Sequence, residues 1–81
     1  MDLNLLKNYK KSVGTKQTMK AIQKGLAVKV LIAEDAESHV VAPLYELCGE
    51  KNLEVIKVES MAALGKACGI DVGTASVAIL K

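Results

Sequence analysis

Three lysines spaced four residues apart, Lys16, Lys20 and Lys24, are the side chains of this sequence most suited to binding chemistry. At ~100° per residue they share one face of a helix. Lys16 would stand in the first turn, where the helix macrodipole is already positive and stability alone would favour an acid. A lysine there, after Gly14 and beside free backbone N–H groups, indicates an anion site. Gln17 both donates and accepts hydrogen bonds, as the reading of a base edge requires. The alternative is a solvated lysine face, the commoner use of such a stripe.

A second candidate site is the segment from Gly69 to Ala75. Ile70 and Val72 are expected to be exposed apolar contacts, and Gly73 would let a partner approach the backbone closely. The segment lacks the Gly-x-Gly-x-x-Gly spacing of dinucleotide-binding loops, and the chain contains no Walker-type sequence. The alternative is an ordinary connection between a helix and a strand.

The remaining reactive residue types do not assemble an active site or a metal site. His39 is the only histidine, and no second His or Cys stands at ligand spacing from it. Cys48 and Cys68 are expected to be small packing residues. The acids of residues 34–37 follow a predicted strand, where α/β folds often bind ligands, but an acidic first turn of a helix explains them equally well. We therefore predict no enzyme, no cofactor and no metal.

The length and composition exclude several classes of protein. The chain has 81 residues, of which 51% are hydrophobic and 25% charged, so we expect one compact domain and no disordered or collagen-like segment. No apolar run reaches the ~18 residues of a membrane-spanning helix. The N-terminal residues lack the basic and then apolar layout of a signal peptide. These features predict a single cytoplasmic domain, residues 1–81, with no membrane partner.

Charge is unevenly distributed along the chain. Residues 1–30 hold seven lysines and one acid, a net charge of +6, whereas residues 31–60 hold seven acids and two lysines, a net charge of −5. This division predicts a basic face for a polyanion, with an acidic face opposite. All the basic residues are lysines, which favours point-charge contacts to phosphates over bidentate contacts to bases. The two tyrosines are the only aromatic residues, too few for a base-stacking platform.

The apolar periodicity and the capping signals predict alternating helices and strands. Helices are expected over residues 3–9, 15–24, 39–52 and 61–68, and strands over residues 28–33, 53–58 and 75–80. Thr15 and Ser60 are expected to cap helices, and Gly25 and Gly69 to end them. Pro43 is expected to break the third helix, because proline can begin a helical turn but not sit within one.

Crossover helices between strands of this length imply a three-layer α/β/α sandwich. The second helix would then have an apolar face against the sheet and its lysine stripe on the far side. The residues expected on the sheet-facing side are Thr15, Met19, Ile22 and Leu26.

Two separated motifs carry a resemblance to a known family. The first is Gly14-Thr15-Lys16-Gln17-Thr18, continued by Lys20-Ala21 and Lys24-Gly25. The second is Leu64-Gly65-Lys66-Ala67-Cys68-Gly69-Ile70 with the loop behind it. In their order and spacing they resemble the L7Ae superfamily of kink-turn RNA-binding proteins, over nearly the whole chain. The short length and the Thr-Lys-Gln-Thr version are most similar to the bacterial YbxF and YlxQ-type branch.

The resemblance implies one non-enzymatic RNA-binding domain, an α/β/α sandwich around a four-stranded mixed sheet. Its partner would be a kink-turn, a sharply bent RNA internal loop with sheared G·A pairs, in ribosomal or regulatory RNA. By position, Lys16 and Gln17 would face guanine edges, and Lys20 a phosphate. The loop around Asp71 would face the bulged nucleotides, and the region 37–41 would border an extruded base. The implied RNA-binding residues are Gly14, Thr15, Lys16, Gln17, Lys20, Lys24, Glu37, Val41, Ile70, Asp71, Val72 and Gly73.

Three departures from the archaeal and eukaryotic pattern bear on this function. Lys16 and Gln17 stand where Asn-Glu is usual, and an amide accepts from guanine N–H groups less strongly than a carboxylate. Met61 replaces a common basic residue, and Ser38 a common turn proline. The alternative function is a protein-interaction adaptor that keeps the fold without RNA selectivity and uses the acidic middle third. A ligand-binding or enzymatic function would need a deep pocket at the strand ends. In either main hypothesis we expect a monomer.

Overall fold

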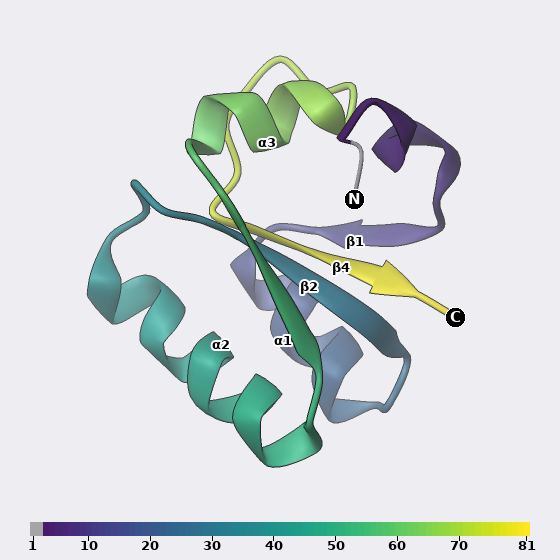
Figure 1. Cartoon of the computed structure of the whole chain (residues 1–81), viewed down its shortest axis with the longest axis vertical. Helices are drawn as coiled ribbons and strands as arrows, with labels where there is room; N and C mark the ends of the chain where they lie inside the picture. Colours follow the sequence, from purple (N-terminus) through teal and green to yellow (C-terminus); the bar gives the residue numbers. More distant parts are fainter. Residues whose placement is uncertain (1–2) are drawn as a thin grey trace.

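A computed structural model describes residues 3–81, with a four-stranded sheet at its centre (Figure 1). In chain order the elements are η1, a 3-10 helix (Leu3–Asn8), β1 (Lys11–Val13), α1 (Thr15–Gln23), β2 (Ala27–Ala33), α2 (Ser38–Lys51), β3 (Glu54–Val58), α3 (Met61–Ala67) and β4 (Ser76–Leu80). The strand order is β1-β4-β2-β3. The sheet is mixed, because β2 and β3 run parallel while β4 is antiparallel to both β1 and β2.

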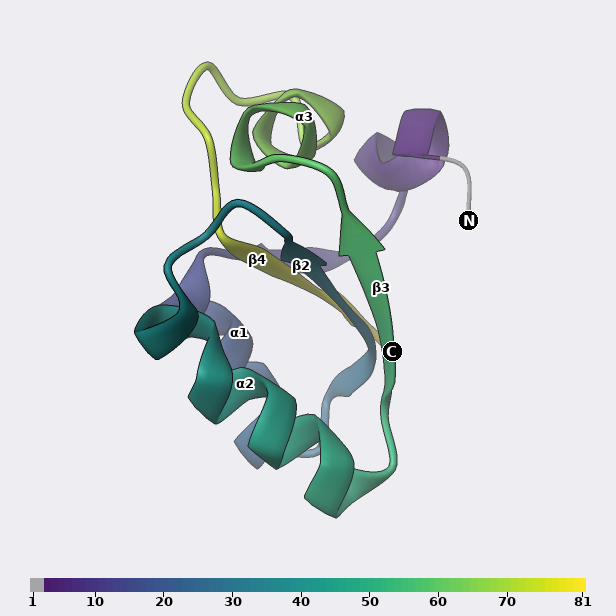
Figure 2. The ribbon, with the colours of Figure 1, turned by 60° about the vertical axis from the view of Figure 1, so that its left-hand side comes forward.

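The sheet is buried on both faces, which confirms the three-layer α/β/α sandwich. Helices α1 and α2 cover one face, and α3 with η1 covers the other (Figure 2). Side chains of a strand point alternately to its two faces. In β2, accordingly, Val30 and Ile32 join the core under α1 and α2, and Leu31 joins the core under α3. The continuous apolar run of β2 is the pattern expected of a strand buried on both sides.

Strand β1 has no counterpart among the strands predicted from the sequence. It has three residues, lies at the edge of the sheet, and pairs only with β4, from Lys11 opposite Ile79 to Val13 opposite Val77. Lys-Ser-Val carries no strand pattern of its own, so its conformation comes from long-range pairing. The fourth strand implied by the family resemblance is therefore present between the first two predicted helices, where the local sequence predicted no strand.

The predicted break in the third helix is wrong. Helix α2 runs without interruption from Ser38 to Lys51 and includes Pro43 in its second turn. A proline there removes the hydrogen bond that the carbonyl of His39 would accept. Both Pro43 and His39 are exposed, so water can reach that carbonyl. The long-range packing of Leu44 and Cys48 in the core holds the helix together past the proline.

The buried face of α1 also differs from the prediction. Thr18, Ala21 and Ile22 are buried, with Met19 packed at the margin of the core. Leu26, expected on the same face, lies beyond the helix and is 47% exposed. The cause is Gly25, whose φ of 73° ends the helix and turns the chain before Leu26. Gly25 therefore acts as the predicted stop.

Candidate nucleic-acid interface

Four loops lie at one end of the sheet, because of the directions of its strands. Strands β2 and β3 are parallel and end together, since the Glu34 N–H donates to the Val58 carbonyl at 2.7 Å. Strand β4 begins at this same end, where the Ala33 N–H donates to the Ala75 carbonyl at 2.9 Å. Strand β1 also ends there. We call this edge the loop end; it carries Gly14 between β1 and α1 and the connections 34–37, 59–60 and 68–75.

The start of α1 is held against the start of β4. The Gly14 N–H donates to the Ser76 carbonyl at 2.9 Å. Between α1 and β4, the Ser76 hydroxyl donates to the Thr18 hydroxyl at 3.3 Å, and both side chains are fully buried. These two contacts bring together the two motifs that the sequence analysis singled out, although 58 residues separate Thr18 from Ser76.

The first turn of α1 is open to a partner. Gly14 is its N-cap, with φ 99° and ψ 155°, and no side chain caps the helix, contrary to the predicted role of Thr15. That backbone conformation is one that glycine adopts and other residues rarely do. A Cβ added at Gly14 would meet nothing within 4 Å, so the space above this turn is free. The backbone N–H groups of a first turn have no partner within their helix and favour an anion.

The lysine stripe lies as predicted on the outer face of α1. Lys16, Lys20 and Lys24 are exposed, as is Gln17 beside the first of them. The opposite face of the helix is buried through Thr18, Ala21 and Ile22. The stripe therefore begins at the loop end and follows the helix away from it.

The loop before β4 displays apolar side chains on a backbone that is held in place. Val72 is 70% exposed and Ile70 36% exposed, while Thr74 is buried. The Thr74 N–H donates to the Met61 carbonyl at 3.1 Å, and the Ile70 N–H to the Gly65 carbonyl at 3.1 Å. Asp71 and Gly73 are exposed between these anchors. Exposed valine and isoleucine side chains on a fixed loop provide a surface for a partner.

Glycines let this loop lie directly against α3. A Cβ on Gly65 would clash with the carbonyl oxygen of Val72, and a Cβ on Gly73 would lie 3.1 Å from the Met61 carbonyl carbon. Gly65 is a helical residue with an ordinary backbone conformation, so close packing rather than φ requires a glycine. Gly65 belongs to the second motif, but its packing role was not predicted from the sequence.

The connection between β2 and α2 completes the loop end. Glu37 is the exposed N-cap of α2, and its carboxylate lies 3.3 Å from the His39 imidazole. Asp35 reaches across to the start of α3, where its Oδ1 accepts from the Met61 N–H at 2.7 Å. Val41 is buried in the core under α1 and α2, so its side chain packs in the protein and we leave it out of the proposed interface. No local pattern predicted the hydrogen bond between Asp35 and Met61, which are 26 residues apart.

The acidic region is beside the basic helix rather than opposite to it. The acids Glu46 and Glu50 are exposed on α2, and α2 packs next to α1 on the same face of the sheet (Figures 1 and 2). The expectation of opposite faces is therefore corrected to two adjacent helices of opposite charge. Adjacent regions of opposite charge would orient a polyanion along α1 and away from α2.

Nothing in the described residues assembles a metal or membrane site. Among residues 3–81 there is no group of three or more His, Cys, Asp or Glu side chains that could hold a metal ion. No helix in this part of the chain is long and apolar enough to cross a membrane. A hollow between η1 and α3 has two lysines and no acid or histidine on its walls; its lining is Leu3, Lys7, Ala63, Lys66 and Ala67.

The fold and the loop end together define an α/β/α sandwich that presents a helix N-terminus and an apolar loop side by side. The family model for the ribosomal protein L7Ae/L30e/S12e/Gadd45 family matches residues 3–81. The chain belongs to this family. The match confirms the resemblance drawn from the two motifs.

Individual relatives agree with the bacterial branch. An RNA-binding protein of Geobacillus sp. strain WCH70 is 47% identical over 77 residues, which cover 95% of this chain and 94% of the relative. The RNA-binding protein YbxF of Geobacillus stearothermophilus is 48% identical over 69 residues, 85% of this chain and 84% of that protein. Family membership and these relatives confirm that the chain is not an enzyme.

Solved structures agree with the fold. The 15.5 kD RNA-binding protein of Giardia lamblia superposes with a TM-score of 0.88 at 32% identity, covering 98% of this chain and 70% of that one. A protein of unknown function from Bacillus halodurans superposes with a TM-score of 0.89 at 26% identity, covering 98% of this chain and 83% of the other.

Proposed function

We propose that this protein is a non-enzymatic RNA-binding module that recognises a kink-turn through the loop end. The observation that carries the proposal is the contact of Gly14 with Ser76, which sets the open first turn of α1 beside the apolar loop 70–73. Family membership and the RNA-binding relatives support RNA as the partner. A bent internal loop suits this surface, because it exposes base edges and unstacked nucleotides that a regular A-form groove hides.

Each part of the surface has a distinct role in the proposal. The free N–H groups of the first turn attract the phosphate backbone, and Lys16 and Gln17 face guanine edges. Lys20 and Lys24 contact phosphates further along α1. Ile70 and Val72 pack against the bulged nucleotides, and Asp71 and Glu37 border them. The natural target in this proposal is ribosomal or regulatory RNA, bound by a cytoplasmic monomer.

The first test is titration of a kink-turn duplex against the same duplex with its G·A pairs changed to Watson–Crick pairs. At ~150 mM salt nonspecific phosphate contacts are already weakened. We expect at least about a tenfold preference for the kinked RNA, worth ~1.4 kcal/mol. Equal binding of the two RNAs would overturn kink-turn recognition. If about four lysines contact phosphates, log affinity should fall with log salt at a slope near −3.

Charge reversal of α1 separates RNA binding from folding. Lys16→Glu with Lys20→Glu should abolish binding of the kinked RNA. The same Lys16→Glu change should leave the fold as stable or a few tenths of a kcal/mol more stable, because a carboxylate suits a helix N-terminus. The matched control is Lys51→Glu with Lys57→Glu, which changes the net charge equally at exposed positions on α2 and β3. If the α1 variant still bound the kinked RNA, the lysine stripe would be a solvated surface and not part of the RNA interface.

The second candidate function is a protein-interaction adaptor, favoured by the exposed acids on α2. A basic partner would bind this side of the molecule. The α1 double variant would keep that interaction, whereas Glu46→Lys with Glu50→Lys would remove it. If the wild-type protein showed no preference for the kinked RNA over its Watson–Crick version, the binding of a basic partner to the Glu46→Lys, Glu50→Lys variant would be tested next.

A further inference from the structure

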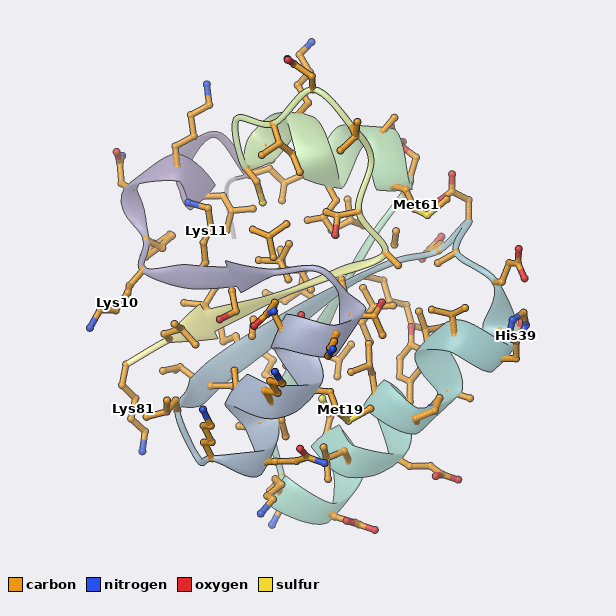
Figure 3. All side chains as sticks on the ribbon, turned by 180° about the vertical axis from the view of Figure 1, so that it is seen from behind. Lys10, Lys11, Met19, His39, Met61 and Lys81 are labelled. Carbon is orange, nitrogen blue, oxygen red and sulfur yellow. The ribbon has the colours of Figure 1, made fainter. Side chains whose placement is uncertain are left out.

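A second group of lysines lies at the end of the sheet opposite to the loop end. There β4 finishes between the starts of β1 and β2. The Leu80 N–H donates to the Lys10 carbonyl at 2.9 Å, and the Lys81 N–H donates to the Leu26 carbonyl at 3.0 Å. Lys10 and Lys81 are exposed on the far side of the molecule from His39 and Met61, which mark the loop end (Figure 3). We call Lys10, Lys24 and Lys81 the lysine corner.

The chain segments that form the lysine corner, residues 9–12, 24–28 and 79–81, contain four lysines and no acid. Glu54, at the same end of the sheet, is paired with Lys29 at 3.8 Å. The ion pairs recorded within residues 3–81 are Lys29 with Glu54 and His39 with Glu37, so none of the corner lysines has such a partner in the described chain. Like charges gathered without counter-charges destabilise a folded protein slightly, and a bound polyanion relieves this.

The corner is continuous with the stripe on α1. Lys24 is both the last lysine of the stripe and the C-cap of the helix, two residues before Leu26. From Lys16 to Lys24 a helix rises about 12 Å. A row of lysines thus leads from the loop end to the opposite end of the molecule, in the order Lys20, Lys24, Lys81 and Lys10. The longest extent of the molecule is 30 Å. Cations that follow one another over this length suit a nucleic-acid backbone, which carries one phosphate charge at every nucleotide.

We propose that one stem of the RNA bound at the loop end continues along α1 and that its phosphates contact Lys10 and Lys81. The inference rests on the proposed function and extends it to the RNA flanking the kink. The contacts at the corner carry no sequence information, because lysine binds phosphate as a point charge. The protein would therefore require a minimum stem length as well as a kink.

The test compares two kink-turn RNAs that share the internal loop. In the short RNA the stem is just long enough to hold the loop, and in the long RNA it exceeds the 30 Å length of the protein. We expect the wild-type protein to bind the long RNA more tightly and with a steeper salt slope. Lys10→Gln with Lys81→Gln should make the slope on the long RNA shallower by about 1.5, at 0.7 to 0.9 per phosphate contact. The slope on the short RNA should not change.

The matched control is Lys51→Gln with Lys57→Gln, which removes the same charge from exposed positions outside the corner. All four positions are exposed, so neither double variant should change the urea midpoint of unfolding. Equal affinity of the wild-type protein for the two RNAs, or equal slopes for the corner and control variants, would overturn the corner contact. Failure of the proposed function is distinguishable, because then neither RNA would be preferred over its Watson–Crick version.

Discussion

The carboxylate of Asp35 accepts a 2.7 Å hydrogen bond from the backbone N–H of Met61, 26 residues later in the chain. The carbonyl of Met61 in turn accepts from the Thr74 N–H at 3.1 Å. The peptide groups around Met61 thus join three loops of the loop end: the β2–α2 connection, the start of α3 and the loop that displays Ile70 and Val72. An acid at the start of α3 also complements the helix dipole, although it comes from another part of the chain.

Removing the Asp35 carboxylate should loosen this junction. We expect Asp35→Ala to destabilise the protein by about 1–2 kcal/mol, because a charge-assisted bond is lost at an exposed site and the Met61 N–H is left without its partner. Urea denaturation measures the change. The control is Glu34→Ala, since only the backbone of Glu34 makes a recorded hydrogen bond, and it should change stability by less than about 0.5 kcal/mol. Equal effects of the two substitutions would contradict the role of Asp35.

Two helical glycines should respond to the same substitution with opposite signs. Gly65→Ala places a Cβ against the Val72 carbonyl oxygen, so α3 and the loop must separate, at a cost of about 1–3 kcal/mol. Gly49→Ala meets nothing within 4 Å on α2 and should stabilise the protein by about 0.5–1 kcal/mol, because alanine favours the helix. Thermal or urea unfolding of both variants gives the comparison. A stabilised Gly65→Ala protein would show that the loop does not need this contact.

Val72 should matter for binding and not for folding. With 70% of its surface exposed, Val72→Ser is expected to change the free energy of unfolding by less than about 0.5 kcal/mol. The proposed contact with bulged nucleotides predicts a several-fold loss of affinity for kink-turn RNA. Val77→Ser is the contrasting variant, since Val77 is fully buried in the sheet and its loss should destabilise the protein. Unchanged RNA affinity in Val72→Ser would remove Val72 from the interface.

Burial raises the pKa of the Cys48 thiol, because the thiolate would lose its hydration in the core. With the folded-state pKa above the unfolded one, the folded protein holds its proton longer. The protonated Cys48 thiol therefore contributes its full share to the free energy of unfolding below the ordinary thiol pKa of about 8.5. This contribution is lost as the pH rises beyond that value. As the pH rises above about 8.5, the wild-type melting temperature should therefore fall more steeply than that of Cys48→Ala. Parallel curves for the two proteins would contradict this contribution.

The local sequence was sufficient for the elements that carry strong periodic signals. Strand β2 was predicted from its apolar run, and the start of α3 from Ser60, whose hydroxyl accepts from the Ala63 N–H at 3.0 Å. The exposed stripe Lys16, Lys20 and Lys24 follows from helical spacing alone. These features depend on residues that are close together in the chain, so they can be predicted from the sequence.

Other features were decided by tertiary structure, because they depend on residues distant in the chain. Strand β1 exists through its pairing with β4, and α2 continues past Pro43 through its packing in the core. Propensity and proline rules describe isolated segments, and long-range contacts override them. The position of the acidic helix beside α1 follows from strand order, which charge counting along the sequence does not give.

The candidate site shows the same division. Its residue types, the lysines after Gly14 and the apolar pair Ile70 and Val72, were evident from the sequence. Their assembly required the antiparallel pairing of β1 with β4, which sets the start of α1 beside the loop before β4. The supports of that assembly, Asp35 on the Met61 N–H and Gly65 under the Val72 carbonyl, were found only in the structure. A hydrogen bond across 26 residues and a missing Cβ have no local pattern, because their partners become neighbours only when the chain folds.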